Sequence, residues 1–267
     1  MTADKVGIEA PAAGRNAAAA PPRTVRLLLF GAEAQRLEQF IEEYDTLELV
    51  ADAPDIVVCY GGDGTLLAAE LAWPGLPKVP ILNSRTGHRC LRHPPAEVFE
   101  RLAEDRLVHN EYPKLECRIS TASGGSSDVL TPLNEINVQK GRINSAVRYR
   151  VSINEVPYEE GREILGDGFV ICTAFGSTAY FSKITRGVFN QGIGLAFMAT
   201  PEHINHVILP EDAVIRLAIT RGPAVLAYDC ASRFVTLESG DELMVQEHPH
   251  GATILTCDPV TRLDEPF

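Results

Sequence analysis

Residues 55–65 read Asp-Ile-Val-Val-Cys-Tyr-Gly-Gly-Asp-Gly-Thr, an apolar run that ends in a glycine-rich turn. The run at 55–60 has the length and composition of a strand that is buried on both faces of a parallel sheet. Apolar residues at 66–71 predict a helix directly after the turn, ending near Pro74. The turn therefore lies at the carboxyl end of a strand, where open α/β sheets bind their ligands.

The alternation of strands and helices continues on both sides of this stretch. Apolar runs at 24–30 and 79–82 predict further strands, and apolar residues at helical spacing predict helices at 37–44 and 95–102. Strands that alternate with helices favour a mostly parallel sheet with helices on its faces. The sequence thus predicts an α/β nucleotide-binding domain over residues 23–110.

The pattern changes after this domain, where short apolar runs follow one another with turn signals between them. We expect strands at 115–120, 129–139, 147–153, 169–174, 214–219, 224–228, 234–237 and 243–247. One helix is expected from Gly176-Ser177 to about Thr185. These elements predict a mainly β domain over 111–250, followed by a C-terminal segment at 251–267.

Composition limits the class of protein. The 267 residues are 45% hydrophobic, which is enough for a core, and no apolar run reaches the roughly 18 residues that span a bilayer. The net charge of −12 argues against a nucleic-acid surface, which needs clustered Lys and Arg. The six cysteines form no C-x-x-C pair, so a reducing cytoplasm is expected rather than a disulfide framework or a zinc site. Residues 1–22 are rich in Ala and Pro and are expected to form a disordered tail.

The turn at 61–65 is the first candidate for chemistry. Two glycines ahead of an acid let the backbone turn sharply and approach a ligand without interference from a Cβ atom. The N–H groups of the turn and the N-terminus of the next helix favour phosphate, and Asp63 lies where a ligand meets the sheet. An ordinary strand–turn–helix connection with Asp63 as a helix cap has the same sequence pattern.

Two further polar elements interrupt apolar strands. Asn134 and Glu135 stand between Leu and Ile, and an amide beside a carboxylate can recognise a ribose diol or an adenine amino group. An exposed strand face would look similar. Residues 166–180 read Gly-Asp-Gly-Phe-Val-Ile-Cys-Thr-Ala-Phe-Gly-Ser-Thr-Ala-Tyr, a buried strand that turns into a helix with Ser177 or Thr178 as cap. Such a turn presents hydroxyl and N–H groups to a ligand, although a well-capped helix needs the same residues.

Together the three elements resemble the NAD kinase family. That family carries a Gly-Gly-Asp-Gly-Thr loop, an Asn-Glu pair and an Asp-Gly…Thr-x-x-Gly-Ser-Thr-Ala-Tyr segment in this order, as found here at 61–65, 134–135 and 167–180. Asp229 and the residues after it also look like the family's later strands, so the resemblance spans about residues 25–247. It implies an α/β domain and a mainly β domain with the active site in the cleft between them.

The resemblance also implies an activity and a set of roles. The protein would transfer the terminal phosphoryl group of ATP or polyphosphate to the adenosine 2′-hydroxyl of NAD, giving NADP, with Asp63 as the general base. The implied binding residues are Gly61, Gly62, Gly64 and Thr65 for the donor's phosphates, with Asn83 nearby, then Asn134 and Glu135 for the acceptor, Ser177, Thr178, Ala179 and Tyr180 for its adenine and ribose pocket, and Asp167 for the other end of NAD. Mg²⁺ would accompany ATP without a dedicated protein metal site. A homo-oligomer, either a dimer or a tetramer, would complete the active site.

Three departures from the family pattern fall around this pocket. The family's Asn-x-Gly-x-x-Gly-Phe-Leu segment lacks Gly-Phe here, at 83–91, and the family's Asp-Gly is Asp229-Cys230. Residues 181–186 add bulk and two bases, Lys183 and Arg186, which are expected to share one helix face. These bases would either meet a substrate phosphate or be two solvated charges on an amphipathic helix.

These departures leave alternative functions open. A kinase with the same loop can act on another hydroxyl, such as that of a nucleoside, a sugar or a lipid, and a non-catalytic nucleotide-binding regulator is a third reading. The sequence also leaves open NAD against NADH, ATP against polyphosphate, and the size of the oligomer.

Overall fold

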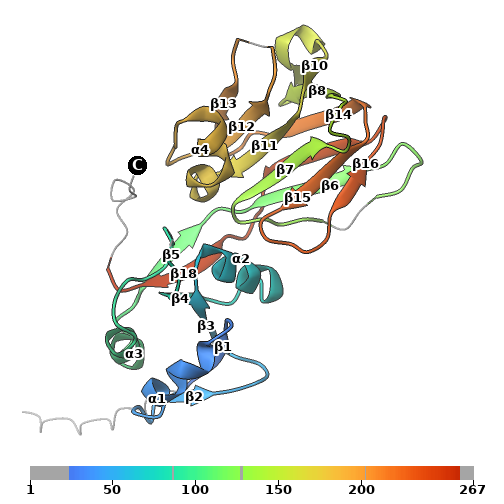
Figure 1. Ribbon diagram of the computed structural model, residues 1–267. Helices are drawn as coiled ribbons and strands as arrows, with labels where there is room; N and C mark the ends of the chain where they lie inside the picture. The colour runs from blue at the N-terminus through green and yellow to red at the C-terminus, as the bar shows by residue number, and fades with distance from the viewer. Residues whose placement is uncertain (1–23, 86, 127–128, 202, 259–267) are drawn as a thin grey trace, which may run out of the picture.

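An α/β part and a mainly β part make up the chain, as predicted, and the chain crosses between them twice (Figure 1). The computed structural model describes residues 24–85, 87–126, 129–201 and 203–258, so the predicted tail at 1–22 lies outside the described residues. None of the helices in the described part of the chain is long and apolar enough to cross a membrane.

The first sheet has six strands in the order β2-β1-β3-β4-β18-β5. They are β1 (Val25–Phe30), β2 (Leu47–Leu49), β3 (Ile56–Gly61), β4 (Lys78–Leu82), β5 (Val108–Tyr112) and β18 (Ala252–Thr256). All neighbours pair in parallel except β5, which is antiparallel to β18. Strand β3 is buried on both faces as its sequence predicts, because Val58 packs with α1 and α3 whereas Val57 and Cys59 pack with α2.

The helices of this part agree with the predicted positions in two of three cases. Helix α2 (Asp63–Ala72) starts three residues earlier than predicted and α3 (Pro95–Ala103) has its proline in the first turn. The predicted helix at 37–44 is instead a 3₁₀ turn, η1 (Ala34–Leu37), followed by a single turn, α1 (Glu38–Ile41).

The second part is a sandwich of two antiparallel sheets, in the orders β10-β8-β14-β17-β6 and β13-β12-β11-β7-β15-β16, with β9 paired to β8. Its strands are β6 (Leu115–Ser120), β7 (Glu135–Lys140), β8 (Val147–Ile153), β9 (Val156–Pro157), β10 (Ile164–Gly166), β11 (Gly168–Thr173), β12 (Ile193–Met198), β13 (His206–Leu209), β14 (Ile215–Arg221), β15 (Ala224–Tyr228), β16 (Val235–Leu237) and β17 (Glu242–Glu247). A short turn, η2 (Tyr158–Gly161), follows β9. Buried side chains of both sheets, such as Tyr149, Phe169 and Phe197, form one core between them.

Two predicted elements of this part differ from the structure. The run predicted as a strand at 129–139 pairs as β7 only from Glu135, because Leu133 is drawn into the cluster around α2. The helix predicted at 176–185 is divided at Ala179, whose ψ of −121° is not helical. It forms a 3₁₀ turn, η3 (Phe175–Thr178), and a short helix, α4 (Tyr180–Thr185).

The chain passes from the first part to the second after β5 and returns after β17. The two crossings lie side by side, since the N–H of His248 donates to the carbonyl of Lys114 at 2.8 Å. Strand β18 then inserts between β4 and β5. Both ends of the sandwich therefore connect to neighbouring strands of one sheet, which fixes the sandwich next to α2.

Candidate functional site

Asp63 is the first residue of α2, directly after the extended N-cap residue Gly62. Its carboxylate accepts the backbone N–H groups of His88 at 3.0 Å and of Arg89 at 2.9 Å. The interpretation of Asp63 as a helix cap is therefore wrong, because the cap position belongs to Gly62 and the carboxylate is held by the segment after β4. The N-terminus of α2 favours an anion, and within its first turn the N–H of Thr65 donates to the carbonyl of Gly62 at 2.9 Å.

The glycines of the turn differ in the space that surrounds them. A Cβ atom on Gly61 would lie 2.2 Å from Oγ1 of Thr65, so only glycine lets that side chain rest against the end of β3. Nothing lies within 4 Å of the Cβ position of Gly64, whose carbonyl accepts a bond from the thiol of Cys230 at 3.5 Å. Cys230 belongs to the sandwich, so the sandwich contacts the turn directly.

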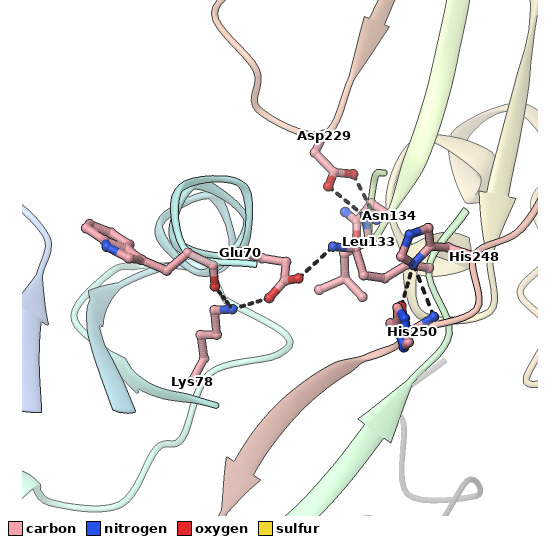
Figure 2. A network of polar contacts seen from close by, with 9 residues as sticks. Glu70, Lys78, Leu133, Asn134, Asp229, His248 and His250 are labelled. Carbon is pink, nitrogen blue, oxygen red and sulfur yellow. Dashed lines mark hydrogen bonds and ion pairs between the residues drawn. The ribbon is translucent and has the colours of Figure 1, made fainter. Parts of the chain in front are cut away.

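Asp229 organises the Asn-Glu pair from the end of β15. Its carboxylate accepts the backbone N–H groups of Leu133 at 2.7 Å and Asn134 at 2.8 Å (Figure 2). It also accepts the N–H of Glu135 at 3.1 Å. Burial raises the pKa of Asp229 to about 6, and the three N–H donors oppose that rise. Sequence reasoning noted Asp229 as part of a family signature but gave it no role; its signal was an acid at a strand end beside a departure from the pattern.

Glu135 brings a buried carboxyl group to the start of β7. Burial, with a smaller contribution from the nearby Asp229, raises its pKa to about 8. Its Oε2 is buried and has no hydrogen-bond partner among the described residues. The raised pKa favours the protonated form of Glu135, which can donate a hydrogen bond. A buried oxygen without a partner is a candidate for contact with a ligand.

The raised pKa of Glu135 predicts how stability depends on pH. An acid whose folded pKa exceeds its ordinary value of 4.5 favours folding while it is protonated, so this contribution is complete below pH 4.5 and is lost as pH rises to about 8. From pH 6 to 8 we expect the unfolding free energy of the wild type to fall relative to Glu135→Gln, by up to about 1.4 kcal/mol per pH unit. Urea unfolding at several pH values measures this, and parallel curves for the two proteins would contradict it.

The turn η3 approaches the Asn-Glu pair through Gly176. A Cβ atom there would lie 2.3 Å from the carbonyl oxygen of Asn134, so glycine is required for this close contact. Thr173 joins the same unit, because its hydroxyl donates to the carbonyl of Leu133 at 2.6 Å and accepts the N–H of Gly176 at 3.0 Å. The second and third sequence elements are thus assembled side by side.

The residues after Gly176 differ in what they expose. Neither Ser177 nor Thr178 caps a helix as predicted, because the N-cap residue of α4 is Ala179. The buried hydroxyl of Ser177 instead donates to the carbonyl of Phe189 at 2.9 Å. Thr178 and Ala179 are half-buried, and the hydroxyl of the exposed Tyr180 accepts a bond from Gln139 at 3.3 Å.

The two bases that follow Tyr180 occupy different positions relative to α4. Lys183 is exposed on α4, whereas Arg186 has left-handed backbone angles and ends that helix. Only Lys183 therefore extends from the helix that follows the turn η3.

Of the two remaining predicted residues, Asp167 lies apart from this assembly and Asn83 lies beside the 61–65 turn. Asp167 precedes β11 and forms an ion pair with Lys140 at 2.7 Å. Because a strand rises about 3.3 Å per residue, β11 (Gly168–Thr173) places Asp167 roughly 20 Å from Thr173, at the end of the strand that leads into η3. Asn83 is exposed after β4, where its N–H donates to the carbonyl of Gly61 at 2.8 Å and its amide to Glu33 at 3.2 Å.

A buried ion network connects α2 with β4 and with the first crossing (Figure 2). The carboxylate of Glu70 on α2 pairs with Lys78 of β4 and, at 2.6 Å, with Lys114 of the first crossing, and all three side chains are buried. Lys78 also donates to the carbonyl of Trp73 at 2.6 Å. Sequence reasoning missed this network, because neither lysine stands in a motif.

The described residues bring the Asp63 turn next to the sandwich. Leu133 and Phe175 pack in one apolar cluster with side chains of α2, and Cys230 contacts the turn itself. A pocket of about 290 Å³ lies on the β5 side of Phe175, but the predicted site residues do not line it. The candidate site is therefore the junction of the 61–65 turn with the Asn134-Glu135 and Gly176–Tyr180 elements.

Comparisons with known proteins were made by sequence first. No protein-family model matches the chain. An NAD kinase of Levilactobacillus brevis is 32% identical over 179 residues, which are 61% of this chain and 65%, just under two thirds, of that protein. An NAD kinase of Chloroflexus aggregans is 28% identical over 226 residues, which cover 80% of this chain and 79% of that protein.

Solved structures show the same fold. Yeast NADH kinase in complex with NADH superposes with a TM-score of 0.77 at 16% identity, covering 91% of this chain and 86% of that one. An NAD kinase from Archaeoglobus fulgidus in complex with ATP has a TM-score of 0.70 at 18% identity, covering 87% and 94%. The curated relatives and the solved structures agree: the chain is similar to NAD kinases in sequence and shares their fold.

Proposed function

We propose that the protein transfers the terminal phosphoryl group of ATP or polyphosphate to the adenosine 2′-hydroxyl of NAD, giving NADP. The observation that carries the proposal is the junction of an anion-binding helix end, which bears the carboxylate of Asp63, with the buried carboxyl of Glu135. The curated relatives are NAD kinases, and the solved neighbours contain NADH or ATP, which supports both substrates.

The donor end of the site is the turn at 61–65. Its glycine backbone and the first-turn N–H groups of α2 would bind the donor's phosphates, with Thr65 and Asn83 beside them. Asp63 would take the proton of the attacking hydroxyl, which is a poor nucleophile until that proton has an acceptor. Phosphoryl transfer otherwise depends mostly on positioning and on charge stabilisation.

The acceptor end would be the sandwich side of the junction. Glu135, in the protonated form that its raised pKa favours, would donate a hydrogen bond to the acceptor, and Asn134 would add its amide. Thr178, Ala179 and Tyr180 would line the adenine and ribose pocket, while Ser177 would support the turn through its bond to Phe189.

Mg²⁺ is the cation expected with ATP. Among the described residues no three His, Cys, Asp or Glu side chains cluster as a protein metal cage. A Mg²⁺ ion that is held mainly by nucleotide phosphates and water needs no such cage, so these residues are compatible with it. When bound it would neutralise phosphate charge.

Asp167 requires a separate explanation because it lies at the far end of β11. We propose that it contacts the other end of NAD in a neighbouring subunit, within a homo-oligomer in the cytoplasm. This oligomer is a dimer or a tetramer in our proposal, and size-exclusion chromatography with light scattering tests it.

An acceptor screen with Mg-ATP tests the proposed function against the other hydroxyl acceptors. NAD, NADH, nucleosides, sugars and diacylglycerol are compared at equal concentration, and polyphosphate replaces ATP in a parallel series. We expect NAD or NADH to be phosphorylated faster than every other acceptor. Preferential phosphorylation of a sugar, nucleoside or lipid would refute the proposal, and a folded protein that binds nucleotide but phosphorylates nothing would indicate a regulator.

Glu135→Ala should weaken acceptor binding more than donor binding. Loss of one hydrogen bond in a buried site predicts a rise of about tenfold in the KM of NAD, with the KM of ATP within about twofold of wild type. Glu135→Gln, which keeps a donor, is the matched control and should stay within about threefold. Calorimetric titration of NAD and of an ATP analogue checks that KM reports binding. An affected ATP affinity with unchanged NAD affinity would reverse the assignment of the two ends.

Lys183→Ala tests whether α4 meets a substrate phosphate. A partly exposed charged contact predicts a rise of about tenfold in the KM of one phosphate-bearing substrate, little change in thermal stability, and a smaller effect at high salt. Arg186→Ala is the control, because Arg186 lies past the end of α4. If Lys183→Ala leaves both KM values and their salt dependence unchanged, the substituted segment at 181–186 does not contact a substrate.

A further inference from the structure

Arg89 contacts both parts of the protein at once. Its backbone N–H donates to Oδ1 of Asp63 at 2.9 Å, and its guanidinium donates to the carbonyl of Phe175 at 2.5 Å. The guanidinium also lies over the ring of Phe175, 4.3 Å from its centre. One residue therefore links the carboxylate at the start of α2 with the first residue of η3.

The partner on the sandwich side is held rigidly. Phe175 is buried, packs edge-on against Tyr112 with ring centres 4.7 Å apart, and belongs to the apolar cluster that includes α2 residues. Gly176, which follows it, lies against Asn134. The bond to the carbonyl of Phe175 therefore fixes Arg89 relative to the turn η3, which carries proposed acceptor residues.

The partner on the α/β side is the carboxylate of Asp63, and its orientation depends on the segment that contains Arg89. The carboxylate of Asp63 accepts N–H groups from His88 and Arg89, which stand in an irregular segment between β4 and α3. His88 is exposed, whereas Cys90 and Leu91 at the end of the segment are buried, so the exposed part of the segment is the part that holds Asp63. The guanidinium bond is a long-range contact, 86 residues along the chain, that holds the segment in place.

We propose that Arg89 is a positioning residue: it holds the segment that orients Asp63 at a fixed distance from the acceptor side of the site. The proposal rests on the proposed function and adds a determinant of its geometry. The Gly-Phe of the family pattern is missing from this segment, which contains His88 and Arg89. A misplacement of about 1 Å between base and hydroxyl can cost up to about a hundredfold in rate. Loss of the bond between Arg89 and Phe175 is therefore expected to lower the rate.

Kinetics of Arg89→Leu and Arg89→Lys give the first test. We expect Arg89→Leu to lower the kcat of NADP formation about tenfold, with both KM values within about threefold and thermal stability nearly unchanged, because the apolar cluster remains. Arg89→Lys should recover part of the loss, since a lysine can still donate to the carbonyl. Wild-type kcat in Arg89→Leu would overturn the proposal.

Arg101→Leu is the matched control. Arg101 donates to the carbonyl of Cys257 at 2.6 Å across 156 residues and pairs with Glu97, but all three lie in the α/β part away from Asp63. Loss of this similar bond should lower stability at least as much as Arg89→Leu and leave kcat unchanged. An equal loss of kcat in both variants would reduce the Arg89 effect to general destabilisation and overturn the proposal.

A double-mutant cycle asks whether Arg89 acts through Asp63. In an Asp63→Asn background, Arg89→Leu should lower the residual rate less than about twofold, because the base it positions is gone. An equal tenfold loss in both backgrounds would contradict the proposed route.

Hydrogen exchange separates this proposal from the proposed function. Backbone amides of residues 87–90 and 174–177 should exchange about tenfold faster in Arg89→Leu than in wild type or Arg101→Leu, whatever the activity. Faster exchange in Arg89→Leu, combined with a wild-type protein that forms no NADP, would support the positioning role of Arg89 and refute the proposed kinase activity. Unchanged exchange in Arg89→Leu, combined with NADP formation by the wild type, would refute the positioning role of Arg89 and leave the proposed function intact.

Discussion

Asp63→Asn is expected to fold normally and to lose at least about a hundredfold in turnover. A positioned general base contributes about 10²–10⁴ to a rate, and asparagine cannot take the proton. The amide oxygen can still accept the N–H groups of His88 and Arg89, so the segment after β4 should keep its place. The measurement is kcat with saturating NAD and ATP, together with thermal unfolding and nucleotide affinity.

Asp52→Asn is the control for this substitution. Asp52 is exposed in the connection between β2 and β3, so the same chemical change there should leave both turnover and stability within a small margin. Near-normal turnover in a folded Asp63→Asn protein would remove Asp63 as the base. A loss of turnover that follows a loss of nucleotide affinity would instead give Asp63 a role in binding.

Glu70→Ala is expected to destabilise the fold by about 3–5 kcal/mol, because it leaves two buried cations without their anion. The carboxylate of Glu70 pairs with Lys78 and Lys114, which are both buried. Burial lowers the pKa of Lys78 and the bond to Glu70 opposes that shift, so the lysine is expected to lose its proton more readily in the variant. Urea unfolding at pH 7 measures the loss.

The matched control is Glu104→Ala, which breaks an exposed pair with Arg106. Exposed pairs contribute up to about 1 kcal/mol, so the two variants should differ severalfold. Equal, small losses would show that the buried network is not needed for stability. Because Lys114 lies in the first crossing, Glu70→Ala should also loosen α2 from the sandwich, which would appear as weaker protection of Asp63 turn amides in hydrogen exchange.

The strands with continuous apolar runs could be predicted from the sequence, and others could not. β3, β6, β8 and β15 stand within a residue of their predicted bounds because both faces, or one alternating face, are buried. β5, with the sequence Val-His-Asn-Glu-Tyr, has no apolar run; its place is set by pairing with β18, far away in the chain. Such pairing partners leave no local signal.

The candidate site shows the same division. Motif and strand position predicted that the 61–65 turn would follow a buried strand and start a helix, as observed. The direction of the Asp63 carboxylate, the three donors to Asp229 and the tie made by Arg89 depend on contacts between residues 25 or more positions apart. These residues lie outside simple periodic patterns, so only the folded arrangement reveals them.

The position of the transferred phosphate tests the central claim most directly. Wild-type protein is incubated with Mg-ATP and NAD, and the product is analysed by phosphorus NMR and by a dehydrogenase that accepts only NADP. We expect one new phosphomonoester on the adenosine 2′ oxygen, formed in step with ADP and reduced at least about a hundredfold by Asp63→Asn. A phosphate on any other oxygen, or ADP formation without a phosphorylated NAD, would contradict it.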